Sequence, residues 1–196
     1  MLVVNGELVA VSKRVPGHVV GDGTSTIEEL VEIVNSDPRR GIGHEKVLTR
    51  LKFDEQAERL LSEAEKNHET VLAKDEIFYL CAAGNLSMGG TAIDMTDVVH
   101  PDNREMAVRA IKSIGLDVGG VDFLTDDITQ SYKDIGGAIV EVNAAPGFRM
   151  HVAPSEGKPR RSEEHTSELQ SRRNLVCRLL PGKKKKTTIN TRRLEP

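Results

Sequence analysis

Three oxygen-bearing side chains lie on two short apolar segments, residues 115–124 and 136–147. Asp122 is on the first; Glu141 and Asn143 on the second are two residues apart, so in a strand they leave the same face. Glycines open both segments, and about a dozen polar residues join them, which predicts two neighbouring buried strands. A buried carboxylate is costly unless it is paired or binds a cation. Two carboxylates and an amide oxygen suit Mg²⁺.

An alternative interpretation needs no metal. Asp122 and Glu141 could sit at strand ends and face solvent, as most acidic side chains do. Spacing alone leaves both interpretations open.

A glycine-bearing stretch, residues 84–94, is the second candidate for chemistry. It follows a predicted strand at residues 76–83 and contains Gly89 and Gly90, whose backbone N–H groups a ligand could approach closely. Asn85 and Ser87 add side-chain donors and acceptors. On its own this is a weak signal for an anion-binding loop.

The start of the chain predicts a β-hairpin, because Asn5-Gly6 stands between two apolar runs. The second strand runs into Lys13 and Arg14, which could face phosphates or hold a solvated strand edge. His18 follows Pro16-Gly17 and is interpreted as a loop histidine, with a catalytic role as the alternative.

Three amphipathic helices are expected to position these groups. The first starts at a capping box of Thr26 and Glu29 and stops near Ser36. The other two cover about 54–66 and 101–115. Their expected inward residues are Ile27, Leu30, Val31 and Val34; Ala57, Leu60, Leu61 and Ala64; and Met106, Ala107, Ala110, Ile111 and Ile114. The polar stretch 37–46 is a solvated connection or a lid beside a ligand site.

Composition narrows the function classes. The net charge of −3 conceals ten Lys or Arg against four Asp or Glu in residues 161–196, so residues 1–160 carry −9. That acidic body disfavours a nucleic-acid surface. Cys81 and Cys177 have no disulfide framework or metal-site spacing, and no apolar run has the length of a membrane span. A cytoplasmic protein is expected, without membrane or nucleic-acid partners.

A resemblance makes these hints specific. The sequence resembles the ATP-grasp domain of the cyanophycin synthetase family over residues 1 to about 160, where six segments occur in one order: 14–23, 37–41, 43–49, 85–94, 100–103 and 141–150. The resemblance implies an α+β, ATP-grasp-like fold with a mostly antiparallel sheet, helices packed on one face, and an incomplete domain holding the metal-binding half of the site.

The family is an ATP-dependent amino-acid ligase. It activates the C-terminal carboxylate of polyaspartate as an acyl phosphate, adds aspartate, and forms homo-oligomers. The resemblance therefore implies ATP and Mg²⁺ as cofactors, and aspartate and a polyaspartate or cyanophycin chain as partners. By family position, the expected metal ligands are Asp122, Glu141 and Asn143; the expected ATP-binding residues are Lys13, Arg14, Gly89 and Gly90; and the expected catalytic residues are Asn85, Ser87, Arg149 and His18.

Departures from the family are also present. Cys81 stands where relatives usually carry Arg or Lys, and the glycine-rich phosphate flap with its lysine is expected upstream of residue 1. Residues 161–196 resemble a translated sequencing adapter and are expected to be non-native and disordered.

Two alternatives to a cyanophycin synthetase function stay open. The chain could belong to another ATP-grasp carboxylate–amine ligase, similar to glutathione synthetase. It could also be a truncated fragment that is inert or binds Mg-nucleotide weakly without catalysis.

Overall fold

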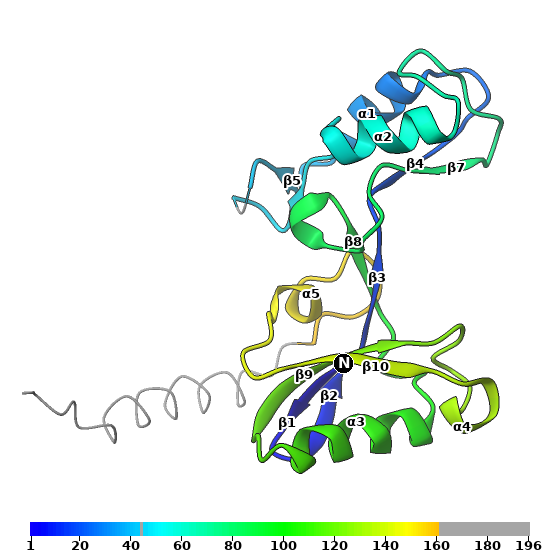
Figure 1. The fold of residues 1–196 in the computed structure, drawn as a ribbon. Helices are drawn as coiled ribbons and strands as arrows, with labels where there is room; N and C mark the ends of the chain where they lie inside the picture. Colours follow the sequence, from blue (N-terminus) through cyan, green and yellow to red (C-terminus); the bar gives the residue numbers. More distant parts are fainter. Residues whose placement is uncertain (44, 161–196) are drawn as a thin grey trace, which may run out of the picture. The chain divides into compact units, whose positions relative to one another are not determined.

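The computed structural model describes residues 1–43 and 45–160 (Figure 1). The tail interpreted above as non-native, residues 161–196, lies outside the described residues, so that prediction stays open. The described part combines helices with mostly antiparallel strands, including a four-stranded sheet in the order β10-β9-β1-β2. An α+β fold was predicted, and the arrangement confirms it.

The four-stranded sheet begins with the predicted hairpin. β1 (Leu2–Val4) and β2 (Glu7–Ala10) are antiparallel, and Asn5 and Gly6 take φ values of 50° and 81°. Positive φ at both turn positions is what a tight two-residue hairpin needs. β9 (Val118–Leu124) pairs with β1, and β10 (Ala138–Asn143) pairs with β9 on its other side.

One face of this sheet packs against α3 (Pro101–Ser113). Val3 and Val121 from the sheet and Ala107 and Ile111 from the helix are fully buried in one apolar cluster. Ile114 was expected to face this core, but it is 54% exposed because the helix has already ended at Ser113.

A second ribbon pairs β3 (Ser12–Val15) with β8 (Thr91–Asp94). Residues 91–94 were interpreted as part of a loop. They form a strand because β3 supplies their backbone partners across a separation of about 80 residues, which local sequence does not show. The described helices include none long and apolar enough to cross a bilayer.

Residues between β3 and β8 build a separate apolar cluster. α1 (Ile27–Asn35) starts at the predicted capping box, with Thr26 accepting from the Glu29 N–H, and α2 (Glu55–Glu63) is capped by Asp54. Both pack with β4 (His18–Val20) and β7 (Ile77–Tyr79).

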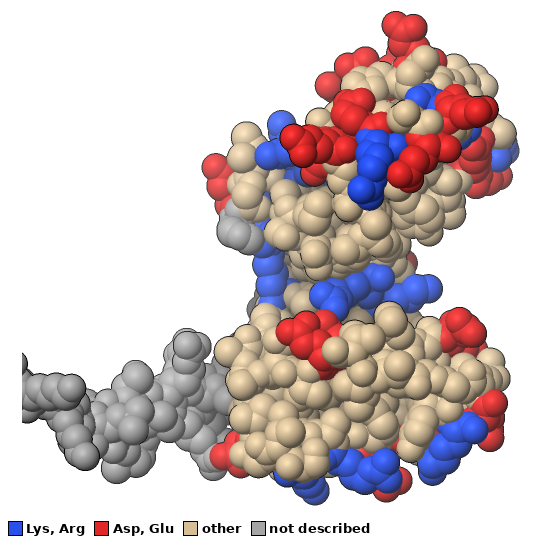
Figure 2. Space-filling model, viewed as in Figure 1, with Lys and Arg blue, Asp and Glu red and all other residues tan. Residues whose placement is uncertain are grey.

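Figure 2 shows acidic side chains gathered over the α1–α2 part, in keeping with the acidic body expected from the sequence. Ala64 was expected to face inward, but it is exposed because α2 ends one residue earlier.

The remaining elements are short. β5 (Arg40–Gly41) and β6 (Leu48–Thr49) pair in parallel, and a 3₁₀-helix covers Leu86–Met88. α4 (Tyr132–Ile135) lies between β9 and β10, and α5 (Arg149–Val152) follows β10.

Gly119 should control how closely α3 approaches the sheet. A Cβ at this position would overlap Ile111 Cδ1, which is fully buried. We expect Gly119→Ala to lower the free energy of unfolding by about 1–3 kcal/mol, the range for overpacked cores, as measured by urea unfolding followed by circular dichroism. Gly147→Ala is the matched control, because a Cβ there meets no atom within 4 Å. Equal stability of the two variants would contradict this packing account.

Candidate functional site

A β-bulge sets the positions of the predicted metal ligands. β9 and β10 pair Phe123 with Ile139, but the next pair is Asp122 with Glu141, so Val140 is the extra residue. Directly paired residues in an antiparallel ladder share a face. A regular ladder would therefore have put Val140 opposite Asp122. The bulge instead puts Glu141 there, as bulges near functional sites often re-aim side chains.

The same register brings the third ligand to this face. Asn143 pairs with Gly120, two residues from Asp122 along β9. A Cβ at Gly120 would lie 2.8 Å from Pro146 Cβ, so the glycine leaves room for the turn after Asn143. Val121 is buried in the α3 cluster, and Asp122 lies on the opposite face. The structure thus brings Asp122, Glu141 and Asn143 to one face.

The expectation that both strands are buried is wrong for β10. Residues 138–141 are exposed, because β10 is the edge strand of the four-stranded sheet. Asp122 is partly buried, with 27% of its side chain exposed. Glu141 therefore faces solvent in the described chain.

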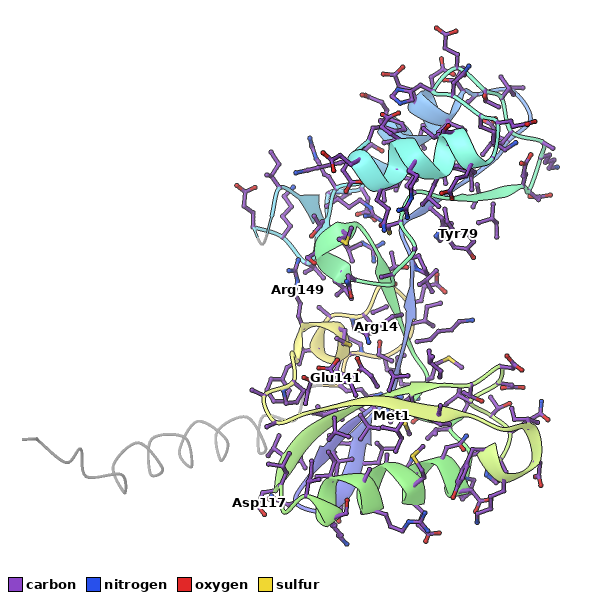
Figure 3. All side chains as sticks on the ribbon, viewed as in Figure 1. Met1, Arg14, Tyr79, Asp117, Glu141 and Arg149 are labelled. Atoms are coloured by element: carbon purple, nitrogen blue, oxygen red, sulfur yellow. The ribbon has the colours of Figure 1, made fainter. Side chains whose placement is uncertain are left out.

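Asp122 has a basic partner. Arg14 Nη2 lies 2.5 Å from Asp122 Oδ2, which joins β3 to β9. Figure 3 labels Arg14 on β3 and Glu141 on β10. Lys13 is exposed and, as the neighbouring residue of a strand, points to the other face. Of the two predicted phosphate-binding cations, Arg14 is the one that contacts the metal-ligand set.

The donor chemistry of this set fits Mg²⁺. Two carboxylates and an amide oxygen lie on adjacent strands, and Mg²⁺ typically takes one or two carboxylates while phosphates and water complete its octahedron. Within residues 1–43 and 45–160, no group of three or more His, Cys, Asp or Glu could form a metal cage. The set is suited to a nucleotide-bound cation rather than to a structural metal.

The glycine-bearing loop closes on itself. The Met88 and Gly90 N–H groups both donate to the Asn85 carbonyl, and the Gly89 N–H donates to Leu86. Gly89 and Gly90 are buried, whereas the Asn85 and Ser87 residues are exposed. In this conformation the N–H groups of both glycines are used inside the loop, and Asn85 and Ser87 are the accessible members.

Two further predicted residues have defined surroundings. His18 lies on β4, so its interpretation as a loop residue is wrong; its backbone pairs with Tyr79. Its Nδ1 is 2.9 Å from the Pro16 carbonyl, and its ring is tilted against that of Tyr79. Arg149, on α5, donates from Nη2 to the Lys46 carbonyl.

Stretch 37–46 is attached to the segment that follows β10 at two points. Besides the Arg149 bond, Arg39 Nη1 donates to the Ser155 carbonyl at 3.1 Å. The sequence pattern did not predict these two hydrogen bonds. It also did not predict that Arg40 and His151 are buried. An Arg-Arg pair in a polar stretch is typical of solvent-exposed chain, so the local composition predicted an exposed Arg40.

The chain is similar in sequence to curated cyanophycin synthetases. The chain is 57% identical to the cyanophycin synthetase of Crocosphaera subtropica and 54% identical to that of Trichormus variabilis, each over 160 residues, which is 82% of this chain and 18% of the relative. The chain is homologous to the cyanophycin synthetases. It spans 18% of the length of these curated relatives, and no protein-family model matches it.

More distant relatives share the fold. The glutathione biosynthesis bifunctional protein GshAB of Clostridium perfringens is 35% identical over 168 residues, covering 86% of this chain and 22% of that protein. The bifunctional glutathione synthetase of Pasteurella multocida superposes with a TM-score of 0.74 at 33% identity, covering 88% of this chain and 24% of the other. These matches confirm the ATP-grasp-like fold of a partial domain.

Cys81, expected above to depart from the cyanophycin synthetase pattern, has defined surroundings. Its thiol is buried, and its Sγ accepts a hydrogen bond from the Gly17 N–H at 3.0 Å. Burial raises the pKa of the thiol, so it stays protonated near neutral pH. The side chain at residue 81 is therefore uncharged.

His151 should make the fold sensitive to acid. Burial, reinforced by the Met1 ammonium and opposed by Asp94, lowers the pKa of His151 to about 4, and its Nδ1 has no partner among the described residues. In the unfolded chain His151 takes up a proton near pH 6.5, whereas in the folded chain it does so only near pH 4. The free energy of unfolding is therefore unaffected by His151 above pH 6.5 and falls as the pH drops from 6.5 toward 4.

We expect wild type to lose about 2 kcal/mol more stability than His151→Leu between pH 7 and pH 4.5. Urea unfolding at both pH values measures the difference, and carboxylate titration common to both proteins cancels. Parallel losses in the two proteins would show that His151 does not carry this effect.

Proposed function

We propose that this chain supplies the metal-binding half of an ATP-grasp active site in a carboxylate–amine ligase of the cyanophycin synthetase type. The observation that carries the proposal is the β9–β10 register, which sets Glu141 opposite Asp122 with Asn143 on the same face. Identity of 54–57% to cyanophycin synthetases supports the same assignment.

In this proposal Asp122, Glu141 and Asn143 hold Mg²⁺. The ion supplies neutralisation of the negative charge on the ATP phosphates, which is a main source of catalysis in phosphoryl transfer. Arg14 pairs with Asp122, and in this proposal its guanidinium binds a phosphate oxygen of ATP. Lys13, Gly89 and Gly90 belong to the predicted ATP-binding set, but Lys13 points to the other face of β3 and both glycine N–H groups bond inside their loop. A nucleotide would therefore meet these three residues only in another conformation.

The reaction proposed for the whole ligase starts from a carboxylate, which is a poor acyl donor. The C-terminal carboxylate of polyaspartate attacks the γ-phosphorus of ATP, which forms an acyl phosphate and releases ADP. The amine of aspartate then attacks the acyl carbon, which forms the amide and releases inorganic phosphate and a proton. Asn85, Ser87, Arg149 and His18 are the proposed groups near the reacting atoms. Water must be excluded from the acyl phosphate, and the 37–46 stretch, held by Arg149, is a suitable cover.

Cys81 bears on the rate of this reaction. A cation beside a developing charge is worth on the order of 3 kcal/mol, and the buried neutral thiol offers none. We propose that a ligase with cysteine here is slower than relatives with Arg or Lys. We also propose a cytoplasmic, homo-oligomeric ligase with neither nucleic-acid nor membrane partners.

A second candidate applies to the 196-residue chain alone: Mg-nucleotide binding without catalysis. The observation favouring it is the exposure of β10, including Glu141, to solvent. A site open on this side cannot exclude water from an acyl phosphate.

Isothermal titration calorimetry with ATP tests the metal assignment. We expect heat from binding in the presence of Mg²⁺ and none in EDTA. Glu141→Gln should weaken Mg-ATP binding by about tenfold or more, which corresponds to about 1.4 kcal/mol, because a carboxylate ligand is lost. Glu7→Gln, an exposed residue of β2, is the control and should bind as wild type does. Wild-type affinity in Glu141→Gln would refute the metal assignment, and absence of any binding would refute nucleotide binding by this chain.

A further inference from the structure

Arg40 is a buried cation that bonds two segments far apart in the sequence. Its residue is 6% exposed, and its Nη1 donates to the Thr49 carbonyl of β6 at 2.6 Å and to the Gly89 carbonyl at 3.0 Å. Its Nε is also buried and has no hydrogen-bond partner among the described residues. The nearby carboxylate of Asp37 is engaged by Arg39, whose Nη2 lies 2.8 Å from it. Within the described chain, backbone carbonyls rather than a carboxylate therefore hold the Arg40 guanidinium.

This arrangement is costly for the stability of the fold. A buried charge needs an opposite charge or dipoles, and a buried donor left unpaired forfeits its hydrogen bond to water. Burial lowers the pKa of Arg40, but a guanidinium keeps its proton at physiological pH. An apolar side chain of similar length would fill the same space without these costs. The reason for a cation here lies in what its two hydrogen bonds hold.

One of these bonds holds residues 84–90, named here the Asn85 loop. The 3₁₀-helix inside this loop packs against β6, the strand that receives the other Arg40 bond. The loop also packs against β3, because a Cβ at Gly84 would lie 2.8 Å from Arg14 Cβ. Arg14 in turn pairs with Asp122 of the metal-ligand set. The Asn85 loop therefore lies directly beside the candidate site.

The anchored residue of the Asn85 loop is buried, and its accessible residues are polar. Gly89 is buried, and its carbonyl accepts the Arg40 hydrogen bond, whereas Asn85 and Ser87 are exposed. A single turn of 3₁₀-helix has few hydrogen bonds of its own and weak geometry. An external anchor at Gly89 therefore limits where Asn85 and Ser87 can stand.

We propose that Arg40 is a positioning residue of the candidate site. Its bond to Gly89 fixes the Asn85 loop against β3, so that Asn85 and Ser87 are presented from a fixed backbone next to Arg14. This inference rests on the proposed function, in which Asn85 and Ser87 lie near the reacting atoms. Arg40 acts through the loop and not by contact with the nucleotide, because its Nη1 is used by two backbone carbonyls and its Nε is buried.

Amide hydrogen exchange of the 196-residue chain, measured by NMR without ligand, tests whether Arg40 holds the loop. Arg40→Met removes both hydrogen bonds and keeps a long side chain. The amides of Met88 and Gly90 bond to the Asn85 carbonyl. We expect both amides to exchange at least about tenfold faster in Arg40→Met than in Leu61→Ala. Leu61→Ala removes buried volume from the α1–α2 cluster and controls for a general loss of stability. Equal exchange rates in the two variants would overturn the proposal.

A double-mutant cycle on Mg-ATP affinity, measured by calorimetry, tests the effect on the site. The loop variant, Asn85→Ala with Ser87→Ala, removes the presented side chains. We expect Arg40→Met and the loop variant each to weaken binding by about fivefold. Their combination should weaken it by no more than about twofold beyond the loop variant alone, because Arg40 acts through these side chains. Leu61→Ala should bind as wild type does. Effects that multiply in full, wild-type affinity in Arg40→Met, or equal weakening in Leu61→Ala would each overturn the proposal.

Failure of the loop and failure of the metal site give different results. Wild-type affinity in the loop variant, with weakened binding in Glu141→Gln, would overturn the role of the Asn85 loop and leave the metal assignment standing. Absence of any Mg-ATP binding would refute nucleotide binding, and hydrogen exchange alone would then decide whether Arg40 holds the loop. If circular dichroism shows that Arg40→Met does not fold, Arg40→Lys replaces it in both experiments, because lysine keeps the charge but loses the guanidinium fork.

Discussion

The pairing of β9 with β10 across the bulge at Val140 is the constraint on which the candidate site depends. Side chains alternate between the faces of a strand, so one extra residue decides which set of β10 side chains joins Asp122. With Val140 left unpaired, polar Glu141 and Asn143 share the face of Asp122. Val142 joins the α3 side, where apolar residues pack.

This register is compatible with the core because each residue meets a suitable environment on its own face. Gly119 and Val121 adjoin α3, where Ile111 leaves no space for a Cβ at residue 119. Gly120 and Asp122 face the other way, toward Pro146 and Arg14. Polar groups that would be costly against α3 therefore lie on the opposite face, where the cation site is proposed.

Much of this architecture could be predicted from local sequence. Asn5-Gly6 requires a tight hairpin, and Thr26 with Glu29 forms the capping box expected of a helix start. The Glu141-x-Asn143 spacing correctly predicts a shared face, because strand periodicity is local. Resemblance to the cyanophycin synthetases predicted the ATP-grasp-like fold, which structural similarity to a glutathione synthetase confirms.

The remaining features depend on distant contacts that local patterns do not report. β8 exists because β3 pairs with it, and β10 is exposed because it lies at the sheet edge. Ala64 and Ile114 continue the apolar periodicity of their helices but fall just beyond the helix ends. Arg40 is buried, and its Nη1 donates to the carbonyls of Thr49 and Gly89. The residues next to Arg40 in the sequence do not indicate these contacts.

A crystal structure of the chain with Mn²⁺ and a non-hydrolysable ATP analogue would show, by anomalous diffraction, which residues hold the metal. We expect an anomalous peak within about 2.5 Å of carboxylate oxygens of both Asp122 and Glu141, with a phosphate oxygen beside it. A nucleotide-bound metal held by other residues, with these two carboxylates uninvolved, would contradict the metal assignment.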